Sequence, residues 1–155
     1  MARVSDDPGT EWCLSFLVRH AWLSMRGVVA EALAEHGLSV AQFGSLMLIE
    51  EEPGLTVAEL ARKVSSTRQS ATEMLAGLER AGLVERRPHP TDRRAHQVFV
   101  TPAGRARLLA ATPDVITVEA GLEADFSAEE RAVVRRWLTT MTSAGTPHGE
   151  EFSTA

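Results

Sequence analysis

Apolar residues recur every three or four positions along much of this 155-residue chain, which is the spacing of one face of an α-helix. The first such stretch covers residues 11–36, and Gly37 follows it as a common helix stop. Ser39 and Gln42 have the spacing of a capping box, which marks the start of a second helix that ends before Pro53. The pattern therefore predicts one long and one shorter helix in the first third of the chain.

Two helices joined by a short polar turn are predicted next. Thr56 and Glu59 repeat the capping-box spacing and open the first of them. Thr67 is the predicted N-cap of the second helix, and Gly82 closes it. This order forms a helix-turn-helix, whose second helix can enter the major groove of double-stranded DNA.

The pattern then changes from helical to extended. Residues 83–88 and 97–101 are predicted strands, because the second is rich in β-branched and aromatic residues and the prolines between them exclude a helix. Pro102 suits the first position of a further helix. Pro113 lies inside that helix and is expected to kink or break it.

A third capping box, Ser127 with Glu130, opens the last predicted helix. Residues 1–10 are a predicted loose arm and residues 145–155 a predicted flexible tail, because both segments are polar. The whole chain, 1–155, is therefore predicted to be one mainly α domain with a small two-stranded β wing.

Composition narrows the class of protein. A hydrophobic fraction of 44% and a charged fraction of 24% are ordinary for a soluble globular domain. No apolar run approaches the length of a membrane span, and the first residues lack the apolar core of a secretion signal. The one cysteine, Cys13, excludes an internal disulfide framework. The predicted location is the cytoplasm.

The charge of the chain is distributed unevenly. The net charge is −5, but residues 59–107 hold ten basic and five acidic side chains and so carry +5. The rest of the chain carries −10. A basic middle between acidic ends suits a protein that meets phosphate with one face only. Uneven surface charge without function is the alternative that this count leaves open.

The second helix of the pair has a polar face opposite its apolar stripe. Glutamine there can pair with adenine, arginine with guanine, and serine or threonine with base edges or phosphates. A carboxylate on this face must meet a cytosine or stand clear of phosphate. An ordinary solvated helix face is the alternative. The face consists of Arg68, Gln69, Ser70, Thr72, Glu73 and Ala76.

The tip of the predicted hairpin carries Arg93 and Arg94 beside Asp92. Guanidinium groups are the preferred cations for a narrow minor groove. Asp92 would repel phosphate, so its predicted role is to support the wing by fixing the turn or orienting an arginine. A charged, solvated turn without function is the alternative.

The sequence DRRAHQVFVTPAG, residues 92–104, resembles the wing signature of the MarR family of bacterial transcription regulators, with Val100 in place of the usual leucine. TVAELARKV and LERAGLVERR resemble the helix-turn-helix of the same family. The resemblance covers nearly the whole chain. It implies an all-α dimer with a small wing, in which residues 39–101 form the DNA-binding lobe.

The resemblance further implies that helices within 11–36 and 102–144 build the dimer interface. Two recognition helices would then enter successive major grooves of a pseudo-palindromic operator, as a repressor relieved by a small-molecule effector. Arg87 could add a backbone contact. The DNA-binding positions that the resemblance implies are Thr67, Arg68, Gln69, Ser70, Thr72, Glu73, Arg86, Arg93 and Arg94.

Relatives often bind small aromatic effectors between the dimer helices and the DNA lobe, which makes Phe16, His20 and Trp22 a candidate effector pocket. Core or interface packing is the alternative. Cys13 suggests a redox-sensing regulator as an alternative function, but the chain has no tyrosine to lower the pKa of the thiol. The histidines show no metal-ligand spacing, so no metal is predicted.

Two other classes of function compete with a DNA-binding regulator. A winged helix can also serve as a protein–protein interaction module, in which case Arg93 and Arg94 would be dispensable for DNA affinity. A similar segment occurs as the dimerisation half of some methyltransferases, but no residues remain here for a cofactor domain. Because no nucleophile–base pair or phosphate loop is present, the chain is predicted to be no enzyme and to need no cofactor.

Overall fold

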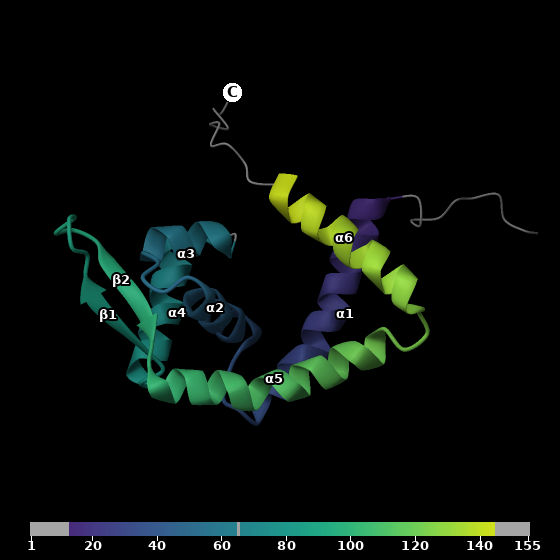
Figure 1. Cartoon of the computed structure of the whole chain (residues 1–155), viewed down its shortest axis with the longest axis horizontal. Coiled ribbons are helices and arrows are strands. Elements are labelled where there is room, and N and C mark those ends of the chain that lie inside the picture. Colours follow the sequence, from purple (N-terminus) through teal and green to yellow (C-terminus); the bar gives the residue numbers. More distant parts are fainter. Residues whose placement is uncertain (1–12, 65, 145–155) are drawn as a thin grey trace, which may run out of the picture. The chain divides into compact units, whose positions relative to one another are not determined.

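In the computed structural model, which describes residues 13–64 and 66–144, six helices and one two-stranded antiparallel sheet follow one another (Figure 1). The order is the one that the hydrophobic pattern predicts. The predicted arm at 1–10 and the tail at 145–155 lie outside the described residues. The elements are α1 (Leu14–Ala34), α2 (Val40–Glu51), α3 (Val57–Lys63), α4 (Arg68–Arg80), β1 (Val84–Pro88), β2 (His96–Val100), α5 (Pro102–Leu122) and α6 (Ala128–Ala144).

The chain forms two compact units, Met1–Glu119 and Ala120–Ala155, and each is described by itself. The first unit holds α1 to α4, the hairpin and most of α5, and the second holds the end of α5 and all of α6. The single domain expected for the whole chain stays a prediction.

One hydrophobic core organises the first unit. Each fully buried aliphatic side chain contributes about 1.5–3 kcal/mol relative to its exposed state. The apolar positions that the helical periodicity marks on α2, α3 and α4 meet here with the inward positions of both strands. The most deeply buried side chains are Leu33, Leu46, Ile49, Leu60, Leu75, Leu78, Val84 and Val98.

The predicted helix caps are confirmed. The cap residue's amide donates to the side chain three positions on, at 2.9 Å for Ser39, 2.8 Å for Thr56 and 2.8 Å for Ser127. Thr67 caps α4 by accepting from the Ser70 amide. Each cap satisfies amide groups that the first turn of a helix leaves without partners.

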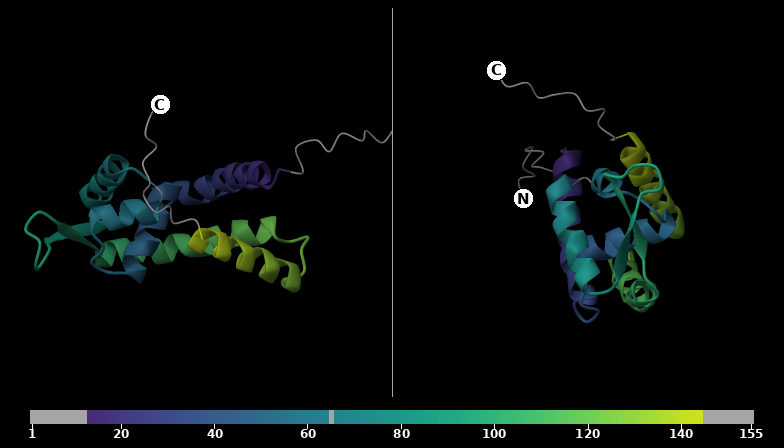
Figure 2. Two further views of the ribbon diagram at one scale, coloured as in Figure 1. Left: turned by 90° about the horizontal axis from the view of Figure 1, so that it is seen from above. Right: turned by 90° about the vertical axis from the view of Figure 1, so that its left-hand side faces the viewer.

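The wing is the antiparallel hairpin of β1 and β2, which projects beyond α2, α3 and α4 in two views of the first unit (Figures 1 and 2). Its strands begin and end within one residue of the predicted bounds. The segment before α3 joins the hairpin, since the Val98 amide donates to the Leu55 carbonyl at 2.9 Å and Thr56 bridges to Gln97. These bonds fix the wing to the helix-turn-helix.

The α5 helix continues through Pro113, so of the predicted kink or break the break does not occur, and the kink stays a prediction. Proline removes the amide hydrogen that would bind the carbonyl of Leu109 one turn earlier. Both residues are exposed, so water can satisfy that carbonyl. The hydroxyl of Thr112 donates to the neighbouring Leu108 carbonyl at 2.7 Å, which supports the same turn.

One arginine ion pair and one histidine–carboxylate hydrogen bond attach α5 to the rest of the first unit. Arg105 donates through Nε and Nη2 to the carboxylate of Glu50 on α2, at 2.5 and 3.0 Å. The hydrogen bonds and charge of Glu50 raise the pKa of Arg105. His36, just after α1, lies 2.7 Å from the Asp114 carboxylate. The long helix is therefore held at two points along its length.

The junction between wing and α5 leaves no room for a side chain at Gly104. The Thr101 hydroxyl donates to the Gly82 carbonyl at 2.6 Å and accepts from the Gly104 amide at 3.0 Å. A Cβ on Gly104 would lie 2.0 Å from the Leu83 carbonyl oxygen. This close approach explains in physical terms why the sequence has glycine three residues after threonine.

Gly104→Ala should therefore destabilise the protein by about 3 kcal/mol, the upper end of overpacking costs, because the clash is with backbone that cannot rotate away. Urea unfolding followed by circular dichroism measures the free energy. Gly27→Ala is the matched control, since a Cβ there meets nothing within 4 Å and a helical alanine is favoured over glycine. Equal stability of the two variants would contradict the close approach.

The Thr56 capping box should make stability depend on pH. Hydrogen bonds from the Thr56 amide and hydroxyl lower the pKa of Glu59 below its usual value. A lowered pKa gives stability that is present above the unfolded value, about 4.3, and is lost as pH falls through the folded value. Glu59→Gln keeps a capping side chain that does not titrate. In urea unfolding, the free energy of unfolding of the wild type should be larger than that of this variant at neutral pH, and the difference should disappear in acid. A difference that does not change with pH would contradict the coupling between the Glu59 pKa and stability.

Candidate nucleic-acid interface

The apolar stripe of α4 decides which of its side chains face outward. Ala71, Leu75 and Leu78 are buried in the core, and Met74 is half-buried beside them. The first two turns therefore expose the opposite face, which comprises the predicted contacts Arg68, Gln69, Ser70, Thr72 and Glu73. The structure brings these five side chains together on one helix, as base reading by the helix start requires.

Several of these side chains already have partners within the protein. The Thr67 hydroxyl accepts from the Ser70 amide at 3.1 Å and donates to the Ser70 hydroxyl at 3.0 Å. The Thr72 hydroxyl donates to the Arg68 carbonyl at 2.7 Å. The Gln69 amide nitrogen donates to the Glu73 carboxylate at 3.1 Å. Their roles on DNA stay predictions.

The tip of the wing is ordered by a local hydrogen-bond network. The Asp92 carboxylate accepts from the Arg94 amide at 2.9 Å, and the Ala95 amide donates to the Asp92 carbonyl at 3.1 Å. The His89 Nδ1 atom accepts from the Asp92 amide at 3.2 Å. These are the contacts that a supporting Asp92 would make. Arg93 and Arg94 are both exposed at this tip.

Ion pairing divides the basic side chains of the lobe into two groups. Lys63 pairs with Glu52, Arg86 with Glu79, Arg87 with Glu85 and Arg105 with Glu50. In the described part of residues 59–107, the arginines without such a pair are Arg62, Arg68, Arg80, Arg93, Arg94 and Arg107, of which Arg107 donates to the His36 carbonyl. Unneutralised charge is thus available at the start of α4 and at the tip of the wing.

Arg86 and Arg87 differ from the arginines of the tip. The Arg86 side chain is 23% exposed, and its Nε lies 3.2 Å from the Glu79 carboxylate at the end of α4. The Arg87 guanidinium lies 4.4 Å from the centre of the Phe99 ring, in the range of a cation–π contact. Both side chains brace the hairpin, and the phosphate contacts expected for them stay predictions.

A cavity of about 730 Å³ lies between α1, α2 and α4 in the first unit. Its polar lining includes Arg26 from α1, Ser45 from α2 and Ser70 from α4. The Ser45 hydroxyl is buried and has no hydrogen-bond partner among the described residues. Sequence reasoning missed this site, although a serine among the core positions of α2 was a signal for it.

The cavity includes only one of the three residues expected in an effector pocket. Trp22 contributes to its lining, whereas Phe16 and His20 do not. The rings of Phe16 and His20 lie 3.9 Å apart on the exposed first half of α1. Phe16 and His20 of the expected pocket thus lie outside the lining of this cavity.

The Cys13 thiol precedes α1 and lies 3.4 Å from the Ser15 hydroxyl. Hydrogen bonds from the Ser15 side chain and the Phe16 backbone lower the pKa of Cys13. Serine thus supplies some of the stabilisation that the absent tyrosines do not, and the redox-sensing alternative stays a prediction.

Other kinds of site find no support in the described part of the chain. No group of three or more histidine, cysteine or carboxylate side chains there could hold a metal ion. No helix there is both long and apolar enough to cross a membrane.

Sequence comparison places this chain among known regulators. The MarR family pattern matches residues 36–95. The HTH-type transcriptional repressor Rv2887 of Mycobacterium tuberculosis is 32% identical over 130 residues, which cover 84% of this chain and 94% of that protein. The HTH-type transcriptional repressor YetL of Bacillus subtilis is 33% identical over 116 residues, with 74% and 70% covered.

Solved structures share the fold. The transcriptional repressor CouR bound to a 23-mer DNA duplex is 30% identical, with a TM-score of 0.79 over 86% of this chain and 95% of that one. A MarR mutant from E. coli complexed with operator DNA is 27% identical, with a TM-score of 0.77 over 87% and 98%. The fold and the exposed arginines define a winged helix-turn-helix, DNA-binding transcription regulator. The chain belongs to the MarR family.

Proposed function

We propose that this regulator is a dimeric repressor that places two α4 helices in successive major grooves of a pseudo-palindromic operator. The observation that carries the proposal is the position of the unpaired arginines. Arg68 opens α4, and Arg93 and Arg94 form the wing tip, where a narrow minor groove attracts guanidinium groups. A bacterial regulator of this kind acts on the chromosome, so its proposed location is the cytoplasm.

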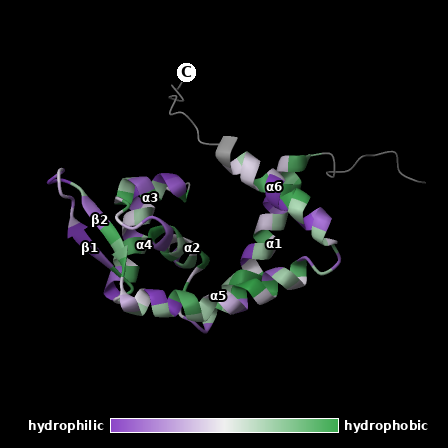
Figure 3. Ribbon diagram, viewed as in Figure 1, coloured by the Kyte–Doolittle hydropathy of each residue, from purple (hydrophilic) through white to green (hydrophobic). Residues whose placement is uncertain are grey.

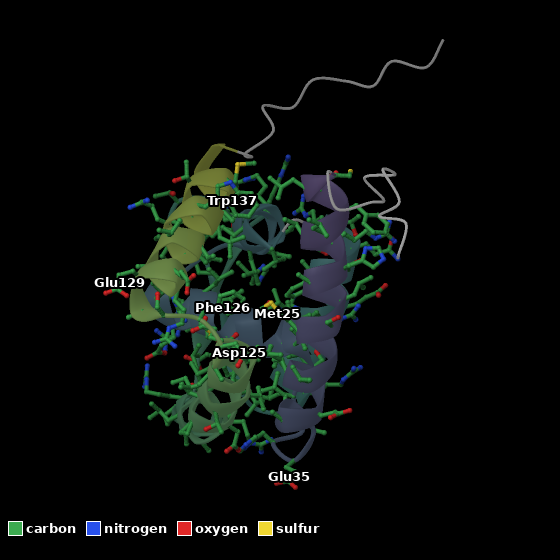
Figure 4. All side chains as sticks on the ribbon, turned by 90° about the vertical axis from the view of Figure 1, so that its right-hand side faces the viewer. Met25, Glu35, Asp125, Phe126, Glu129 and Trp137 are labelled. Carbon is green, nitrogen blue, oxygen red and sulfur yellow. The ribbon has the colours of Figure 1, made fainter. Side chains whose placement is uncertain are left out.

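Exposed apolar side chains support the dimer. On α1, Leu14, Leu17 and Trp22 are 55%, 41% and 52% exposed in the single chain. In the second unit, Phe126 lies in the turn before α6 and is 54% exposed (Figure 4), and α6 adds exposed Val133, Val134, Leu138 and Met141. Figure 3 shows hydrophobic residues along both helices. Apolar exposure of this extent on each unit indicates a partner, and a second copy is the proposed one.

The cavity between α1, α2 and α4 is the proposed effector site. Trp22 offers an aromatic face, Arg26 a positive charge, and the buried Ser45 hydroxyl a hydrogen bond that no described residue makes with it. Together these groups favour a small aromatic acid. Ser70 and Met74 of α4 also line the cavity, so a ligand there would contact the recognition helix from its inner side.

The affinity for DNA should fall steeply as the salt concentration rises. Titration of the protein with duplexes from its own promoter region, at several salt concentrations, should show two chains per duplex. The logarithm of the affinity should fall with the logarithm of salt by about 0.9 for each phosphate contacted. Arg94→Ala should weaken binding to all duplexes alike and reduce the slope by about 1 per chain.

Arg19→Ala on α1 is the matched control, because it removes the same charge from an exposed position outside the DNA-binding lobe. Its salt slope should equal that of the wild type. Absent or salt-insensitive binding would overturn the repressor proposal and favour the protein–protein interaction module instead.

Benzoate should raise the melting temperature of the wild type more than benzamide, because Arg26 can pair with a carboxylate and not with an amide. At a concentration of about 100 times Kd the gain is about 2.7 kcal/mol, or on the order of 5 °C for a chain of this size. Arg26→Gln should abolish the preference, and Arg19→Gln, which lies outside the cavity lining, should keep it. Equal shifts for both compounds in the wild type would refute an aromatic acid as the effector class.

A further inference from the structure

We propose that Glu73 is a positioning residue that holds the Gln69 amide so that its carbonyl oxygen faces the DNA. The recognition helix would then accept a hydrogen bond from an amino group in the major groove, adenine N6 or cytosine N4. The inference rests on the proposed reading of DNA by α4 and specifies which edge of Gln69 does the reading.

The contact that carries the inference lies on the exposed face of α4. Gln69 and Glu73 are four residues apart and therefore neighbours on the helix surface. Gln69 Nε2 lies 3.1 Å from Glu73 Oε1, and both residues are exposed. A carboxylate only accepts hydrogen bonds, so whichever way the amide is turned, it must offer its NH2 group to Glu73.

The contact removes the ambiguity of a free glutamine. A free amide can turn over and offer either its oxygen or its NH2 group to a base, so it tolerates both amino and keto bases. With Nε2 held by Glu73, turning over would place the amide oxygen against the carboxylate, and two acceptors repel. The oxygen therefore stays on the groove side, where adenine and cytosine present amino donors while guanine and thymine present keto acceptors.

The same contact accounts for a carboxylate on a surface that meets phosphate. Glu73 is exposed and has no ion pair among the described residues, so alone it would only weaken attraction to DNA. Its contribution is to order Gln69 before binding, which reduces the conformational entropy lost in the complex.

The test begins with selection from a library of duplexes with a randomised central segment. Duplexes carrying each of the four bases at the position sensitive to Gln69→Ala are then titrated singly. The wild type should prefer adenine or cytosine there by at least about fivefold, the lower end for a good base contact. If adenine is preferred, its replacement by purine, which lacks the amino group, should lose the preference.

Glu73→Ala should bind more tightly overall and lose the preference for amino bases, and Glu73→Gln should keep part of it. In the Gln69→Ala background, Glu73→Ala should leave base preference unchanged, because Glu73 acts only through Gln69. A preference for guanine or thymine, or an unchanged preference in Glu73→Ala, would overturn the inference. Salt-dependent binding of the wild type would still support the repressor, so the two proposals can fail separately.

Discussion

The burial of Ala71, Leu75 and Leu78 sets the rotation of α4 about its axis, and much else in the first unit follows from that rotation. A helix turned by one residue would move about 100° and bring Ser70 or Thr72 toward the core in place of Ala71. The core fixes α4 from three sides, through Leu60 on α3, α2 and Val84 on the wing. The polar face is therefore presented as a rigid unit, so that the base reading proposed for it would need little rearrangement of the protein.

Ion pairs determine which arginines of the lobe keep an unneutralised charge. Counting charges along the sequence gives a basic segment, but only the structure separates the arginines that brace the hairpin from those left for phosphate. Arg86 and Arg87 lie next to each other on β1, and each is paired with a glutamate of its own lobe. Arg93 and Arg94 lie where the hairpin turns and have no ion pair among the described residues. The arginines on the strand of the wing are therefore neutralised by glutamates, and those at its tip keep their charge.

The fold was largely predictable because its signals are local. Capping boxes at Ser39 and Thr56 depend on residues three apart, and the strands on alternation within a few residues. Whether Pro113 breaks the helix or only kinks it could not be decided from the sequence, because the outcome depends on how a carbonyl one turn away is solvated. The cavity was missed for a similar reason: Ser45, Arg26 and Ser70 lie on three different helices, and no spacing along the chain brings them together. Of the interface, the sequence indicated which residues lie on the polar face of α4, but not that Gln69 is tied to Glu73.

Ser70 connects the two faces of the recognition helix. Its amide and hydroxyl are both bonded to Thr67, the N-cap of α4, and its side chain also lines the proposed effector cavity. A ligand that bonds to this hydroxyl competes with the hydrogen bond that the Thr67 hydroxyl donates to it, and so loosens the side chain that caps α4. Complete loss of an N-cap costs about 1 kcal/mol. That is enough to disturb the first turn of α4, where Arg68 and Gln69 lie, without unfolding the lobe. An effector on the inner side of the helix can in this way change binding on the outer side, because both sides depend on the same threonine hydroxyl.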